Sequence, residues 1–206
     1  MSLCFDKYFT EAVEKQLFGT VKQFRADVLA WRDYNWMKLA RGTGVRLCVL
    51  VGLTVGDAQR VAETEYLTVR AEINKRKKAQ ELYAVKSVQM AFHELVLIHK
   101  KMSAGIEWEV EANDRPLILS RNHKGMSARS FQSRMSMWVK KSGLTDGSVH
   151  WWRHTLGKRM MSNGQGDEMK NLRRAQVIFG HSELRTTEIY TKPDKESLKE
   201  LMIDAT

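Results

Sequence analysis

Apolar residues recur at helical spacing along much of this 206-residue chain, and this periodicity constrains its fold more than any other feature. The clearest stripe, at i, i+4, i+8 and i+11, consists of Val13, Leu17, Val21 and Phe24. It predicts an amphipathic helix over residues 10–30 with Thr10 as its N-cap, followed by a second helix over 31–40. Only two prolines occur, so helices meet few obstacles. We therefore expect a mainly α protein with a small antiparallel β-sheet, in the α+β class.

The segment 47–53 is apolar almost throughout and is expected to be a buried helix, with Cys48 as a small core residue. Cys4 and Cys48 show no metal or redox spacing, which fits a reduced, intracellular compartment. A further helix is predicted over 87–101, where most positions are apolar.

Two short β-prone segments, 66–73 and 81–85, flank a basic turn and predict a β-hairpin. The cations of this turn are Lys75, Arg76, Lys77 and Lys78. Such a tip can contact a DNA backbone. The alternative is an ordinary solvent-exposed charged turn, which is more common.

The region 103–125 is predicted to be irregular, with Leu117–Leu119 as a short buried strand. A helix follows it, capped by Ser127 or by Ser130, and ends near Lys141. No repeat, low-complexity tract or flexible linker divides the chain.

Residues 1–206 are therefore expected to form a single domain, with a core at about 10–192 and a tail over 193–206. The tail contains a helix that is too short to be stable unless it docks on another surface.

The formal net charge of +10 concerns the partners of this chain rather than its fold. A Lys/Arg surface gains free energy on nucleic acid through counterion release, so nucleic acid is the first candidate partner. A merely soluble basic protein and an anionic membrane surface are the alternatives. Arg121 and Lys124 belong to a second basic surface. No apolar run approaches the roughly 18 residues that span a bilayer, and the N-terminus carries no secretory signal.

Nucleophile candidates and cationic side chains gather in the last quarter of the chain. If Ser148 caps a helix, then His150, Arg153 and His154 share one face of its first turns, where anions are favoured. Gly157 continues this face without a side chain and permits close packing there.

A similar arrangement follows downstream. Gly180 is expected to end one helix, and Ser182 can cap the next, with His181 just outside it and Tyr190 about two turns in. Arginine binds phosphate through its planar fork, and tyrosine can form a covalent intermediate. The set thus suits metal-free cleavage of a phosphodiester.

Two other interpretations of these residues stay open from spacing alone. His150, His154 and His181 could ligate zinc, but the HExxH pattern requires Glu where Trp151 stands. Alternatively, His154 is a structural residue and Tyr190 is a partly buried core tyrosine.

Together these residues resemble the catalytic domain of tyrosine recombinases, the phage integrase family. The matching segments, in chain order, are Thr43-Gly44-Val45-Arg46, Gly52-Leu53, the basic hairpin at 74–78, His150-x-x-Arg153-His154-Thr155, Gly180-His181-Ser182 and Thr186-Thr187-x-x-Tyr190. The resemblance covers about residues 10–192. It implies the catalytic-domain fold of that family and a site-specific DNA recombinase that cleaves and rejoins strands through a 3′-phosphotyrosyl link. No cofactor and no metal are implied.

The resemblance also implies roles for individual residues. Arg46 and Arg153 would bind the scissile phosphate, and His181 would hydrogen-bond to it. Tyr190 would attack the phosphorus, with His150 as the general base.

A lysine of the hairpin would be the general acid for the leaving oxygen, with Lys75 preferred and Lys77 as the alternative. The further DNA-binding candidates are Arg76, Lys77, Lys78, Arg121 and Lys124.

The implied partners are double-stranded DNA and other protomers in a DNA-bound synaptic tetramer, without a membrane. The tail over 193–206 would dock on a neighbouring protomer or fold back on its own core. The implied location is the cytoplasm of a prokaryote, in association with the nucleoid, whether host- or phage-encoded. The N-terminal DNA-binding domain usual in the family is expected to be absent before Thr10.

Two departures from the family pattern stand out. Val49 occupies a place where the family often has Glu or Asp, and the loop Gly164–Asn171 looks longer than usual. Two alternatives to recombinase function therefore remain, a non-catalytic DNA-binding module with the same fold and a related type IB topoisomerase or telomere resolvase.

Overall fold

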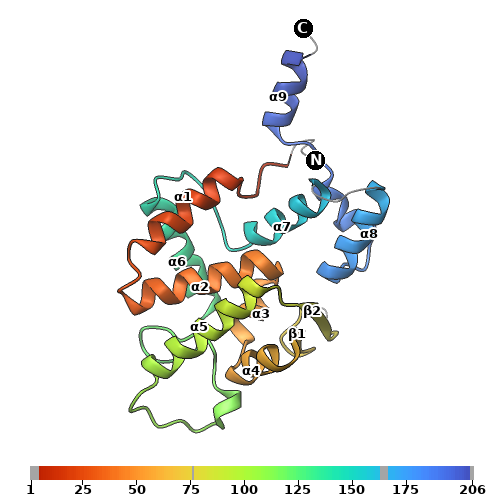
Figure 1. The fold of residues 1–206 in the computed structure, drawn as a ribbon. Coiled ribbons are helices and arrows are strands. Elements are labelled where there is room, and N and C mark those ends of the chain that lie inside the picture. The colour runs from red at the N-terminus through yellow and green to blue at the C-terminus, as the bar shows by residue number, and fades with distance from the viewer. Residues whose placement is uncertain (1–4, 76, 163–166, 205–206) are drawn as a thin grey trace.

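The computed structural model of the chain describes residues 5–75, 77–162 and 167–204. Its α-helices are α1 Glu11–Lys22, α2 Val28–Thr43, α3 Leu47–Gly52, α4 Val55–Thr64, α5 Lys86–Met102, α6 Ala128–Lys141, α7 Trp151–Ser162, α8 Glu168–Phe179 and α9 Lys195–Asp204. Three short 3₁₀ turns are η1 Ala112–Asp114, η2 Leu184–Thr186 and η3 Glu188–Tyr190. Strands β1 Tyr66–Val69 and β2 Gln80–Tyr83 pair antiparallel. The predicted mainly α fold with a small antiparallel sheet is confirmed (Figure 1).

The predicted helix over 10–30 is wrong in its length. Thr10 does cap α1, since its side chain accepts a hydrogen bond from the Val13 backbone N–H. However, α1 ends at Lys22, and Asp27 caps α2 by accepting from the Leu29 N–H at 2.8 Å. A short polar side chain that satisfies a free N–H favours a new helix start over continuation of the old helix.

Helix α2 runs through the middle of the molecule, between α1, α5 and α7 (Figure 1). Its Trp36 and Leu39 are fully buried, as is Phe131 of α6, which meets Trp36 edge to face with ring centroids 5.2 Å apart. Each fully buried large apolar side chain contributes about 1.5–3 kcal/mol to folding. The core is thus built around α2.

The predicted burial of Cys48 and the predicted strand at Leu117–Leu119 need correction. Cys48 is exposed rather than a core residue, because α3 is short and turns only Val49 and Leu50 fully inward. Leu117–Leu119 is buried as predicted but forms no strand, since the backbone there makes only isolated bridges, Thr54 to Pro116 and Leu119 to Gly125.

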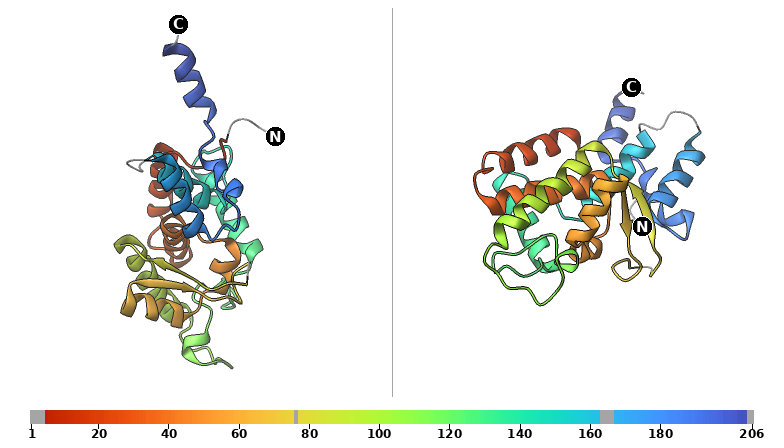
Figure 2. Two further views of the ribbon diagram at one scale, coloured as in Figure 1. Left: turned by 90° about the vertical axis from the view of Figure 1, so that its right-hand side faces the viewer. Right: turned by 60° about the horizontal axis from the view of Figure 1, so that its bottom comes forward.

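The predicted hairpin is confirmed, although its strands are shorter than expected. Its first arm is fixed against the end of α3: Arg70 donates from Nη2 to the Gly52 carbonyl at 2.9 Å. The Ile73 side chain fills the space that a Cβ on Gly52 would need, at 2.3 Å from Ile73 Cγ2. The hairpin therefore leaves the body at a defined place, beside the C-terminal part of the chain (Figure 2, right).

The tail forms the predicted helix, α9, which projects from the body (Figures 1 and 2). Its base is held where Tyr8 donates to the Asp194 carboxylate and the Lys195 N–H donates to Asp6 Oδ1 at 3.0 Å. Beyond this base α9 buries no side chain, and Leu201 is 64% exposed. The alternative of a tail folded back on its own core is therefore wrong.

Within the described ranges, none of the helices has the length and apolar character required to cross a membrane.

Candidate active site

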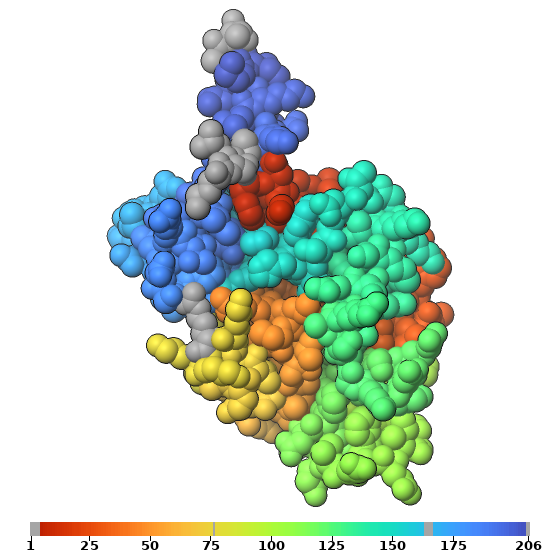
Figure 3. Space-filling view, turned by 180° about the vertical axis from the view of Figure 1, so that it is seen from behind, coloured from red at the N-terminus to blue at the C-terminus, as the bar shows by residue number. Residues whose placement is uncertain are grey.

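A pocket of about 370 Å³ opens between the hairpin, the start of α3, the start of α7 and the segment that follows α8. All the residues predicted to be catalytic line it: Arg46, Lys75, His150, Arg153, His181 and Tyr190. Figure 3 shows the three parts of the chain that meet at this side of the molecule: α3 (orange), the hairpin (yellow) and the C-terminal region (blue). Segments far apart in sequence thus supply one concave site.

Arg46 is presented by a tight turn between α2 and α3. Gly44 ends α2 in the left-handed conformation, with φ of 60° and its N–H bonded to the Ala40 carbonyl at 2.8 Å. A Cβ at Gly44 would lie 2.8 Å from the Phe179 ring, so only glycine fits. Arg46 then occupies the N-cap position of α3 and lines the pocket.

Arg153 is held in place by hydrogen bonds to two separate segments of the chain. It is 5% exposed and donates from Nη1 to the Gly44 carbonyl at 2.8 Å and from Nη2 to the Phe179 carbonyl at 2.7 Å. Its guanidinium also lies 4.4 Å from the centroid of the Phe179 ring. One side chain thereby joins the turn that carries Arg46 to the end of α8.

The hydrogen bonds of His181 define its tautomer. Arg153 Nη2 lies 3.1 Å from His181 Nε2, and a guanidinium can only donate, so Nε2 accepts. The ring proton then resides on Nδ1, which donates to Thr187 Oγ1 at 2.8 Å. Thr187 is fully buried, and sequence reasoning missed it as the support of His181. The sequence feature that could have indicated this role is the position of Thr187 in the Thr186-Thr187 pair shortly before Tyr190.

His150 stands in a turn and not in a helix, because α7 begins at Trp151 rather than near Val149 as predicted with Ser148 as the cap. The His150 and His154 rings still touch, edge to face, with centroids 4.7 Å apart. Burial lowers the pKa of His150, and the charges of Arg153 and its neighbours lower it further. His150 is therefore neutral near pH 7 and free to accept a proton.

His154 is a half-buried imidazole, and its Nδ1 has no hydrogen-bond partner among the described residues. Burial, followed by the charges of His150 and Arg153, lowers its pKa to about 3. The folded protein thus binds fewer protons than the unfolded chain between pH 6.5 and 3. Stability is expected to fall as the pH drops below 6.5, by about 2 kcal/mol at pH 5.

Urea unfolding at pH 7 and pH 5 measures this effect. His154→Gln should reduce the difference by about 2 kcal/mol, whereas the same change at the exposed His93 should leave it intact. An unchanged pH dependence in His154→Gln would contradict the assignment.

Tyr190 lies in the 3₁₀ turn η3, so the predicted α-helix capped by Ser182 is wrong. The N-cap position of η2 is occupied by Glu183, whose side chain makes no capping hydrogen bond. Over 184–190 the backbone forms short 3₁₀ turns with i→i+3 hydrogen bonds instead of an α-helix. The Tyr190 ring is 2% exposed and lies 5.3 Å from Phe179. Burial raises its pKa, while the charge and hydrogen bond of Arg153 oppose this rise.

The Tyr190 ring packs directly against the backbone of Gly157 in α7. A Cβ at Gly157 would lie 2.7 Å from three ring carbons of Tyr190, which is closer than real Cβ contacts allow. The close packing predicted for Gly157 is therefore present, and its partner is the tyrosine.

The hairpin brings one lysine to the site. Lys75 is exposed and lines the pocket. Lys77 does not line it, and its Nζ donates to the Glu72 carbonyl at 3.2 Å. Lys78 is exposed and borders a neighbouring pocket with Gln80. Arg76 falls outside the described residues.

The second basic surface is separate from this pocket. Arg121 and Lys124 are exposed, and Arg121 lines a depression of about 440 Å³ with Arg129 and Arg134. It lies beside α6, so the structure does not bring Arg121 to the catalytic candidates.

The two departures noted in the sequence differ in outcome. Val49 is 3% exposed and belongs to the core. The predicted loop Gly164–Asn171 is wrong in part, because Asp167 caps α8 and Glu168 begins it. Residues 163–166 fall outside the described ranges.

Cys48 and Ile189 also line the pocket and were not predicted to do so. Across the described chain, no three or more His, Cys, Asp or Glu side chains are grouped so that they could hold a metal ion.

Comparison with known proteins bears on the family and the fold of this chain. The model of the family described as "Phage integrase family" matches residues 7–197. The tyrosine recombinase XerC of Psychromonas ingrahamii is 30% identical over 176 residues, which is 85% of this chain and 53% of that protein. The XerC of Shewanella amazonensis is 32% identical over 173 residues, 84% of this chain and 52% of that protein. The chain thus spans about half the length of the curated relatives it matches.

Solved structures share the fold. A crystal structure of XerA recombinase superposes with a TM-score of 0.69 at 22% identity, covering 98% of this chain and 64% of that one. XerH site-specific recombinase bound to difH substrate, in a pre-cleavage complex, gives a TM-score of 0.68 at 16% identity, covering 97% and 54%.

Proposed function

The chain belongs to the phage integrase family, and from this premise we propose that it is the catalytic part of a site-specific DNA recombinase. The observation that carries the proposal is the pocket in which Tyr190 meets Arg46, Arg153 and His181, with His150 and Lys75 at its walls. Metal-free phosphoryl transfer requires a nucleophile, a general base, a general acid and cations that stabilise the phosphate. The pocket contains side chains for each of these roles, with the proposed acid on the hairpin.

The proposed cleavage step is a transesterification. The Tyr190 phenol oxygen attacks the scissile phosphorus, and its proton passes to His150, which is neutral near pH 7. The new bond joins phosphorus to the tyrosine oxygen, and the bond from phosphorus to the 5′ oxygen breaks. Lys75 gives a proton to that leaving oxygen. Rejoining is the reverse reaction, driven by a 5′-hydroxyl from another strand.

The arginines stabilise the charge that develops on the non-bridging oxygens. Arg46 at the start of α3 and the buried Arg153 of α7 both line the pocket, so a phosphate bound there would receive donors from two elements. Because Arg153 is already held by the Gly44 and Phe179 carbonyls, it needs little reorganisation when the phosphate arrives.

A selection for covalent adducts tests the proposal. Double-stranded DNA with a nick beside a randomised core is incubated with the protein, and SDS-stable complexes are isolated and sequenced. Loss of the short fragment below the nick prevents rejoining, so the 3′-linked adduct accumulates. Adducts sharing one sequence support a site-specific recombinase, and adducts without sequence preference would favour a topoisomerase. DNA binding without any adduct would favour a non-catalytic module.

Gly157→Ala is expected to lower the rate of adduct formation by about 10²-fold, since the added methyl displaces the Tyr190 ring from its seat. The matched control is Gly19→Ala in α1, where nothing lies within 4 Å of the added Cβ. The control should keep full activity and gain about 0.5–1 kcal/mol of stability. Equal cleavage rates for the two variants would contradict the packing argument.

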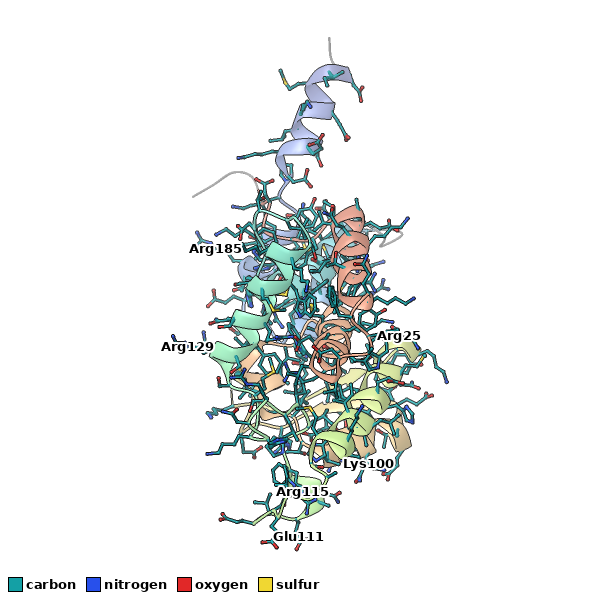
Figure 4. The ribbon with its side chains drawn as sticks, turned by 90° about the vertical axis from the view of Figure 1, so that its left-hand side faces the viewer. Arg25, Lys100, Glu111, Arg115, Arg129 and Arg185 are labelled. Atoms are coloured by element: carbon teal, nitrogen blue, oxygen red, sulfur yellow. The ribbon has the colours of Figure 1, made fainter. Side chains whose placement is uncertain are left out.

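Double-stranded DNA is the proposed partner, and its backbone would run from the hairpin to the surface beside α6. Arg129→Ala should reduce the slope of log affinity against log salt by about one. Figure 4 labels Arg129 and Arg25 at opposite sides of the molecule, so Arg25→Ala is the control and should leave the slope unchanged. A reduced slope in both variants would contradict this path.

A second copy of the chain is the other proposed partner. Exposed apolar side chains of α9, among them Leu201 and Met202, suit docking on a neighbouring protomer of a DNA-bound synaptic tetramer. A prokaryotic cytoplasm, with the enzyme on nucleoid DNA, is the location consistent with such a substrate.

A further inference from the structure

Gln80, the first residue of β2, connects the hairpin to the last turn of α8. Its Nε2 donates to the Val177 carbonyl at 3.1 Å and to the Ile178 carbonyl at 2.5 Å. The last carbonyls of a helix carry partial negative charge, so an amide N–H₂ group suits them, although the Val177 carbonyl also accepts from the Gly180 N–H at 2.9 Å. The side chain also packs over Gly180, with Oε1 3.1 Å from the place of a Cβ there.

The strands of the hairpin bury Leu67, Val69 and Leu82 in the core, so the further anchors bear on the position of the tip that carries Lys75. On the β1 side it is fixed by Arg70 and Ile73 on Gly52. Its tip is closed by Asn74, which is 7% exposed and donates from Nδ2 to the Lys78 carbonyl at 2.8 Å. On the β2 side the link to the rest of the site is Gln80.

The end of α8 that receives Gln80 also orders the opposite wall of the site. Arg153 holds the carbonyl of Phe179, the next residue after Ile178, and Gly180 then turns the chain into His181. The hairpin lysine and the phosphate-binding side chains are therefore positioned from the same helix terminus, by two neighbouring sets of hydrogen bonds.

We propose that Gln80 is a positioning residue that holds Lys75 at the leaving-group side of the scissile phosphate. The inference rests on the proposed function, in which Lys75 protonates the 5′ oxygen. Without the Gln80 bonds the hairpin keeps its anchor on α3 but loses the one on α8, and Lys75 no longer stays within reach of the leaving oxygen.

A substrate whose leaving group needs no proton can test whether Gln80 acts by positioning the general acid. Loss of a residue that only positions the acid should slow cleavage of the ordinary substrate but not of this one. In a 5′-bridging phosphorothiolate a sulfur replaces the leaving oxygen, and sulfur departs without protonation. Single-turnover adduct formation is measured with both substrates at saturating protein, using the site recovered from the adduct selection. The variants are Gln80→Ala, Lys75→Ala and Gln89→Ala.

Gln80→Ala is expected to slow cleavage of the ordinary phosphodiester by about 10- to 100-fold, within the contribution typical of general acid catalysis. With the phosphorothiolate it should match the unmodified protein. Gln89 is the matched control, since its Nε2 also donates to a backbone carbonyl, that of Ala84 at 2.8 Å, but away from α8. Gln89→Ala should behave as the unmodified protein with both substrates.

The outcomes distinguish this inference from the function on which it rests. If Lys75→Ala is rescued by sulfur and Gln80→Ala is slow on both substrates, Gln80 acts through the His181 side and the inference is overturned. Full activity of Gln80→Ala on the phosphodiester also overturns it. If Lys75→Ala is not rescued, the assignment of the general acid in the proposed function fails first.

Discussion

Tyr190→Phe is expected to abolish the covalent protein–DNA adduct completely while leaving the fold and DNA affinity intact. The phenyl ring of the variant fills the same seat against Gly157 and Phe179, so packing is preserved. Loss of one hydroxyl that is hydrogen-bonded to Arg153 changes the free energy of unfolding by about 1–3 kcal/mol. The phenol oxygen, by contrast, is the only atom of this side chain that can bond to phosphorus.

The measurement is SDS-stable adduct formation on the selected nicked DNA, together with affinity and thermal unfolding of the same variant. Tyr83→Phe is the matched control, because Tyr83 is 55% exposed on β2 and does not line the pocket. An adduct that persists in Tyr190→Phe would assign the nucleophile to another residue.

Asp33→Ala is expected to cost about 3–5 kcal/mol of folding stability. Asp33 is fully buried in α2. Its Oδ1 accepts from Arg32 Nη2 at 2.7 Å and from Trp36 Nε1 at 3.0 Å, and its Oδ2 accepts from Trp138 Nε1 at 2.8 Å and from Arg134. Removal of the carboxylate leaves the Arg32 charge, which is 3% exposed, inside the protein without its counterion.

Chemical denaturation of Asp33→Ala and Glu14→Ala provides an internal comparison. Glu14 is also buried and pairs with two arginines, but Arg41 is 38% and Arg159 is 29% exposed, so water can solvate them after the change. Glu14→Ala should therefore cost clearly less than Asp33→Ala. Equal losses would show that burial of the cationic partner is not the controlling factor.

Much of the candidate site follows from local spacing. Residues four apart on adjoining turns must be neighbours, which is why His150 and His154 touch although α7 begins later than predicted. Gly180 ends α8 in the left-handed conformation that glycine adopts without strain. The turn after α2 likewise follows from Gly44.

Other features depend on which of two local structures is more stable, and the spacing of apolar residues does not reveal this. The break between α1 and α2 depends on the Asp27 cap, which prevails over a continuous apolar stripe. Cys48 is exposed because α3 is too short to bury every apolar position. The 3₁₀ conformation around Tyr190 replaces the α-helix that Ser182 suggested.

The sequence by itself determined the helical character, the hairpin, and the kinds of side chain that phosphodiester chemistry needs, because each depends on residues close together in the chain. Only the tertiary structure decided which of them meet. Arg153 bonds to the Gly44 carbonyl across 109 positions, Tyr190 packs on Gly157, and Gln80 reaches the end of α8 across 97. Contacts at such separations depend on the packing of whole elements around α2, which residue spacing along the chain does not encode.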